Sequence, residues 1–138
     1  MRLECRWLPW VLSAVLGCAA DSTAPTSSER FTPPAAYLTW FDRTEACSGL
    51  GGEFDRLRFY RVPGDEFPCP SGMCVAHWTD SHEIYVAEAF IQDEMVIRHE
   101  MLHDLIGHPG HPDPPFGPAG CALTWTSWSG RLGSRTID

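Results

Sequence analysis

The strongest constraint on the fold is one well-bounded amphipathic helix, which we expect to begin near Asp93 and to end at Gly107. Asp93 can cap the first turn, Gly107 can supply the left-handed end, and Pro109 cannot continue the helix. Residues at steps of three and four share one face of it. That face consists of Met95, Val96, His99, Leu102, His103 and Ile106. The fold must therefore bury an apolar helix face that carries two histidines.

The size and charge of the chain limit the classes of protein it can be. Its 138 residues suffice for one small domain, and 43% hydrophobic residues suffice for a core. The formal net charge is −8, and all ten basic residues are arginine. An acidic chain without a basic stripe excludes nucleic acid as a partner. We expect a monomer.

The N-terminus reads as an export signal. Residues 1–17 combine a charged start, "MRLECR", with an apolar stretch too short to span a bilayer comfortably. The stretch ends in "VLGC", which resembles a bacterial lipobox; the resemblance implies cleavage before Cys18 and a lipid on its thiol. The alternative is an ordinary secretory signal cut near Ala20. Under either reading the protein is exported, and under the first it is lipid-anchored in the bacterial cell envelope.

Composition divides the remaining chain into three parts. Residues 18–36 are the lipidated cysteine and a flexible tether rich in Ser, Thr, Ala and Pro. Residues 37–129 hold the apolar and aromatic residues of the folded domain. Residues 130–138 form a loose C-terminal tail.

The folded part should be α+β. We expect a short helix that ends at Gly49, a strand within residues 54–62, and two β-rich runs at 74–78 and 83–87 with a polar turn between them. The helix that begins near Asp93 follows these runs. A short sheet and one long helix are the expected architecture.

Four cysteines remain after export, and they predict two disulfides. Cys69 and Cys74 lie close together in a Pro-Gly loop, so we expect them to pair locally. Cys47 would then pair with Cys121. A cysteine metal site is the alternative, but it lacks a second close pair of cysteines.

The sequence His99-Glu100-Met101-Leu102-His103 is an H-E-x-x-H motif within the expected helix. Residues at i and i+4 lie one above the other, so both imidazoles can reach one metal ion. Glu100 is displaced sideways and can accept a proton from a water on that ion. This pattern favours a zinc site that performs hydrolysis over a histidine-rich surface helix.

The stretch "VIRHEMLHDLIG" resembles the active-site helix of the zincin metallopeptidases, and "EIYVAEA" before it resembles their edge strand, on which a substrate chain pairs. The resemblance covers roughly residues 83–112. It implies a small zincin-like α+β domain with a short mixed sheet. It also implies Zn²⁺ on His99 and His103, Glu100 as general base, and a peptide or protein substrate.

The third zinc ligand must lie downstream. Zincins of the thermolysin type use a later Glu, and none follows Glu100; the metzincin pattern fails too, because Ile106 and Pro109 stand where its Gly and third His would be. The candidates are His108, His111 and Asp113. His111 has the reach, because "HPG" can reverse the chain before it. His108 is the alternative ligand, or a group that stabilises the developing oxyanion.

A competing function keeps the metal without the reaction. About 100 mature residues are few for a peptidase with a real specificity pocket. The alternative is therefore a non-catalytic zinc-binding or structural lipoprotein of the envelope.

Asp104, next to His103, is expected to face solvent.

The anchor can be tested by itself. Cys18→Ser removes the thiol that would carry the lipid, so the variant should leave the membrane fraction, as cell fractionation would show. A variant that stays with the membrane, beside a wild type whose mass shows no lipid, contradicts the lipobox.

Overall fold

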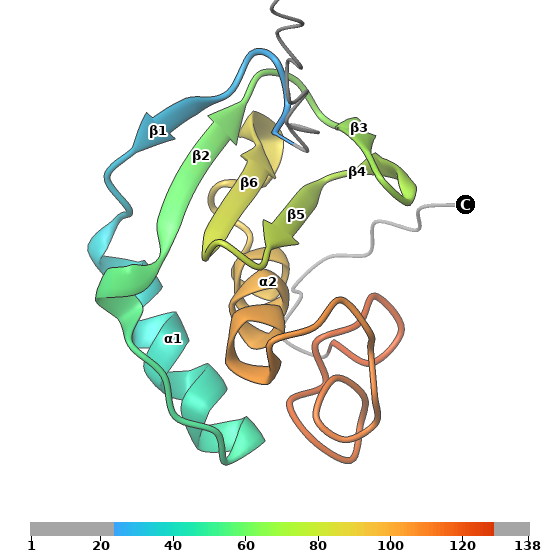
Figure 1. Ribbon diagram of the computed structural model, residues 1–138. Coiled ribbons are helices and arrows are strands. Elements are labelled where there is room, and N and C mark those ends of the chain that lie inside the picture. The colour runs from blue at the N-terminus through green and yellow to red at the C-terminus, as the bar shows by residue number, and fades with distance from the viewer. Residues whose placement is uncertain (1–23, 129–138) are drawn as a thin grey trace, which may run out of the picture.

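Two helices lie on one side of a four-stranded mixed sheet in the computed structural model (Figure 1), which makes the fold α+β as expected. The structure describes residues 24–128, so the expected signal peptide, Cys18 and residues 130–138 lie outside the described part. The elements are β1 (Glu29–Phe31), α1 (Ala35–Ser48), β2 (Arg58–Val62), β3 (Phe67–Cys69), β4 (Gly72–Cys74), β5 (Ala76–Thr79), β6 (Glu83–Ala87) and α2 (Glu94–Ile106), with short 3-10 helices at Phe54–Arg56 and Glu88–Phe90.

The sheet has the order β1-β2-β6-β5, and only its central pair is parallel. β1 pairs antiparallel with β2, and β5 pairs antiparallel with β6. The loop between β5 and β6 is three residues long, and His82 at its end has a φ of 61°. Such loops need a left-handed residue there, and His adopts that conformation more readily than most side chains. β3 and β4 form a separate two-stranded hairpin.

The expectation that residues 83–89 form an edge strand is wrong. β6 has a strand on each side, and four of its five residues are buried. The edge beyond it is β5, because the tight hairpin folds the earlier strand back onto the outer side of β6. A strand that is hydrogen-bonded along both sides cannot accept another chain, whereas β5 has an unpaired side in this sheet.

Both helices end where their glycines allow. Gly49 closes α1 and Gly107 closes α2, each with φ near 70° and with its N–H bonded to the carbonyl four residues earlier. The Asp93 side chain accepts a hydrogen bond from the N–H of Val96, so it caps α2 as expected.

The core lies between the sheet and the helices. Phe59, Ile84 and Trp78 form one row across β2, β6 and β5, and all three are buried. Ile97 and Met101 of α2 pack in the same cluster and have no exposed surface. This packing sets the histidine-bearing helix directly beneath the edge strand.

Ordered structure begins earlier than composition suggests. β1 lies inside the stretch expected to be a tether, and Phe31 packs against Tyr37 and Phe59 with ring centroids 6.2 Å apart in each case. Three residues can join a sheet through backbone hydrogen bonds alone, which leaves little signal in composition. Within residues 24–128, no helix is long and apolar enough to cross a membrane.

The two disulfides expected from the sequence, Cys47–Cys121 and Cys69–Cys74, are both present. Cys47–Cys121 joins the last turn of α1 to the loops that follow α2, across 74 positions of sequence. Cys69–Cys74 closes the β3–β4 hairpin.

The two crosslinks should differ in their effect on stability. In the chain-entropy account, removing Cys47–Cys121 as the double alanine variant should cost about 4 kcal/mol, and removing Cys69–Cys74 only about 2 kcal/mol. Urea unfolding of the two double variants measures the difference. Equal losses would show that loop length does not control it.

Candidate metal centre

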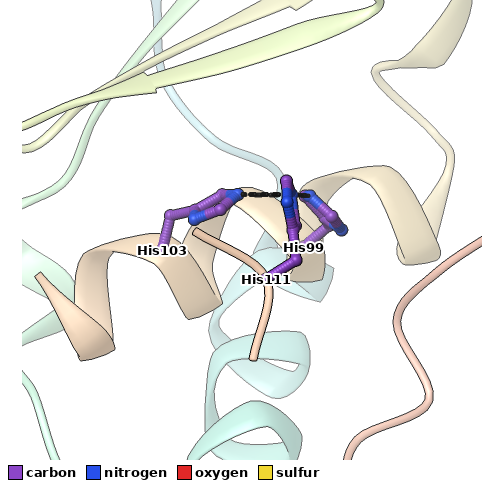
Figure 2. A group of neighbouring side chains, drawn as sticks. All are labelled: His99, His103 and His111. Atoms are coloured by element: carbon purple, nitrogen blue, oxygen red, sulfur yellow. Dashed lines mark hydrogen bonds between the residues drawn. The ribbon is translucent and has the colours of Figure 1, made fainter. Parts of the chain in front are cut away.

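Three imidazoles converge on one point above α2 (Figure 2). His99 and His103 come from successive turns of the helix, and His111 comes from the loop beyond it. The Nε2 atom of His111 lies 2.9 Å from that of His99 and 3.2 Å from that of His103, and the His99 and His103 Nε2 atoms are 3.2 Å apart.

The other ring nitrogens of His99 and His103 set their tautomers. Nδ1 of His99 lies 2.7 Å from the backbone oxygen of Leu123, and Nδ1 of His103 lies 3.0 Å from that of His108. A carbonyl oxygen can only accept, so each neutral ring must carry its proton on Nδ1. The Nε2 atoms therefore face each other with bare lone pairs.

Burial keeps these imidazoles neutral. Burial, with a smaller contribution from the neighbouring histidines, lowers the pKa of His99 to about 4 and that of His103 to about 3. Burial also lowers the pKa of His111. Neutral imidazole is the form that binds a metal, so the site needs no proton loss near neutral pH.

The donor set fits a divalent cation of the zinc type. In a tetrahedral site with Zn–N bonds of about 2.0 Å, ligand nitrogens are roughly 3.3 Å apart. The three separations observed, 2.9 to 3.2 Å, are close to that value. Three histidines also leave a fourth position for water or substrate.

The loop after α2 decides which side chain joins the pair. The chain reverses after Gly107, and the ring of His108 turns away, where its Nδ1 accepts the N–H of Gly110. His108 contributes its backbone oxygen to His103 instead of a metal ligand. Asp113 is also absent from the cluster, because its carboxylate accepts the N–H of Ala119. The structure thus brings His111, the favoured candidate, to His99 and His103.

Phe116 is a site residue that the sequence reasoning missed. Its ring has no exposed surface and lies 4.6 to 4.9 Å, centroid to centroid, from all three imidazoles. The backbone of Phe116 is held on both sides, by Pro112 and by Leu123. Its signal was available, because Phe116 is the one large apolar residue between Gly107 and Gly120. Phe116 therefore packs against all three imidazoles at once.

Glu100 is buried beside the three histidines that could hold a metal. Burial raises the pKa of its carboxyl group to about 8, and a hydrogen bond from the backbone N–H of Trp78 opposes that shift. A cation held by the adjacent histidines would favour the charged carboxylate. A carboxyl group poised in this way can accept or release a proton near neutral pH.

The centre opens onto a cleft of about 1100 Å³. Its walls come from the β3–β4 hairpin, the edge strand β5, the first turns of α2, and the turn at residues 124–128. Met73 and Trp125 belong to this lining and are about half exposed. The cleft is mainly apolar, with the histidines and Glu100 at its base.

Asp104 does not face solvent, contrary to expectation. Its side chain is 2% exposed, and its Oδ1 accepts from Nε1 of Trp78 at 2.8 Å and lies 2.7 Å from Nδ1 of His82. The helix period places Asp104 near the apolar face. The sequence does not show that Trp78 and His82 lie close enough to donate to it. These bonds go to Trp78 and His82, whereas Nδ1 of His103 bonds to the backbone oxygen of His108.

Comparison with protein-family models, with curated proteins and with solved structures found no match to this chain. The site geometry therefore carries the functional argument by itself.

The choice of histidine can be checked by metal content. His111→Ala removes one of three nitrogens, so zinc affinity should fall by roughly 10-fold or more. His108→Ala, the matched control in the same loop, should keep the metal because its backbone oxygen remains. The measurement is competition with a chromogenic chelator. Retention of zinc by His111→Ala and loss by His108→Ala would reverse the assignment.

Proposed function

We propose that this protein is a zinc-dependent peptidase of the cell envelope, with zinc on His99, His103 and His111 and with Glu100 as general base. One observation carries the proposal. Three imidazole nitrogens and a buried carboxyl group meet at the base of a cleft that an edge strand borders. The Nε2 atoms lie 2.9 to 3.2 Å apart, which is the spacing that shared ligation of one cation requires.

Zinc in this site would lower the pKa of a water molecule and polarise a substrate carbonyl. Glu100 would accept the proton of that water and later pass it to the leaving amine. Glu100 is buried and lines the same cleft as the three histidines. The hydrogen bonds to Leu123 and His108 would hold the His99 and His103 rings with Nε2 toward the ion.

The edge strand favours an extended peptide as substrate. The oxygen of Val75 accepts the N–H of Ala87, so odd-numbered residues of this segment direct their backbone groups toward β6. Ala76 and Trp78 direct theirs to the open side. The N–H of Trp78 is used by Glu100, which leaves Ala76 for pairing with another strand. Peptide side chains could then enter the apolar cleft.

Zinc is the metal that this donor set favours. Imidazole nitrogen suits zinc, copper, iron and nickel, whereas magnesium and calcium prefer oxygen ligands. Zinc has no redox chemistry of its own, and three neutral histidines with an open fourth position match hydrolytic zinc sites.

Glu100→Gln separates binding from chemistry. The amide keeps the size and polarity of the carboxyl group but cannot take a proton. The variant should therefore retain one zinc per chain and lose roughly 100-fold or more of its hydrolytic rate. Glu88→Gln, at an exposed position outside the cleft lining, is the matched control and should change neither property.

The assay measures zinc content and the cleavage of an unfolded protein by residues 19–138 made in an oxidising compartment. An unchanged rate in Glu100→Gln would overturn the mechanism. Full zinc occupancy without cleavage of any substrate would instead support the non-catalytic zinc-binding lipoprotein.

A further inference from the structure

Asp104 is a buried carboxylate whose cost must be offset. Its side chain is 2% exposed, and both neighbouring donors reach the same oxygen, Nε1 of Trp78 at 2.8 Å and Nδ1 of His82 at 2.7 Å. The guanidinium of Arg56 lies 3.9 Å from the second oxygen. A carboxylate in such a place is tolerated only with these partners. The same hydrogen bonds fix the side chains of Trp78 and His82 relative to α2.

Trp78 connects that carboxylate to the candidate metal centre. Its indole ring lies nearly parallel to the imidazole of His103, with an interplanar angle of 20° and centroids 6.1 Å apart. Its backbone N–H donates to the Glu100 carboxyl group. One residue of the edge strand thus contacts a ligand, the proposed base and a buried anchor on α2.

We propose that Trp78 is a positioning residue, which the Asp104 carboxylate locks in place so that β5 holds Glu100 and His103 in their working orientations. This inference rests on the proposed function for its catalytic consequence, but the positioning itself is a property of the fold. Asp104 and His103 are adjacent on α2, and Trp78 lies across from both on β5. The bond between the indole and Asp104 therefore joins the strand to the helix directly beside the candidate metal centre.

Loss of the hydrogen bond between Trp78 and Asp104 should lower the rate of hydrolysis more than it weakens metal binding. The histidine rings keep their own bonds to Leu123 and His108, and Phe116 still packs against them. Glu100 depends on the backbone of Trp78, so a shift of β5 moves the base relative to the substrate carbonyl. Small misplacements of a catalytic group cost up to about 100-fold in rate.

Trp78→Phe removes the indole donor and keeps an aromatic ring, and Asp104→Leu removes the acceptor. Both should accelerate amide exchange at residue 78 by about tenfold and lower kcat by roughly 10- to 100-fold, with zinc content unchanged. Asp104→Asn keeps an oxygen for the indole and should restore most of both properties. Thr79→Val is the matched control on the same strand, because the buried Thr79 hydroxyl has no partner among the described residues.

Amide exchange is followed by NMR on the metal-free chain, and kcat and KM on the zinc form. Unchanged exchange at residue 78 in both Trp78→Phe and Asp104→Leu would overturn the inference. Faster exchange in a protein that cleaves nothing would retain the inference and reject the proposed peptidase. Should both variants fail to fold, Glu100→Ala decides: exchange at residue 78 must accelerate, and no change would exclude the link between Trp78 and Glu100.

Discussion

The convergence of three imidazole nitrogens on one point is the constraint on which the site depends. Carbonyl oxygens of Leu123 and His108 hold the protons of His99 and His103 on the outward ring nitrogens. Burial then disfavours the protonated rings that could otherwise share a hydrogen between them. The Nε2 atoms of His99 and His103 are therefore lone-pair acceptors that face each other, and a cation bound between them would satisfy both.

The loops after α2 carry as much of the site as the helix does. They supply His111, the Phe116 ring and both backbone oxygens, although they contain no regular secondary structure up to residue 128. Cys47–Cys121 ties them to α1, and Phe116 buries their interior against the histidines. A small domain has too small a hydrophobic core to hold such loops by burial alone. A disulfide and one buried aromatic side chain hold them instead.

Local signals predicted the elements well, because they act over a few residues. The capping by Asp93 and the ends at Gly49 and Gly107 follow from backbone geometry that the sequence states directly. The local pair Cys69–Cys74 left one partner for Cys47, so the disulfides followed too. The predictions that were wrong concern the position of a strand in the sheet and the burial of a side chain. β6 became an inner strand, and Asp104 became a buried anchor, because strand order and burial depend on residues far apart in the chain.

The sequence by itself determined that two histidines and Glu100 share a capped helix, since a period of 3.6 residues puts positions i and i+4 on one face whatever surrounds them. It narrowed the third metal ligand to three candidate residues, but it could not show which of them contacts the two helix histidines. Only the tertiary structure decided that His111 turns inward, that Phe116 lies against the three rings, and that Trp78 joins Asp104 to Glu100. The physical reason is that these contacts cross between a strand, a helix and a loop. Their geometry comes from packing, to which every element contributes, and no single segment encodes it.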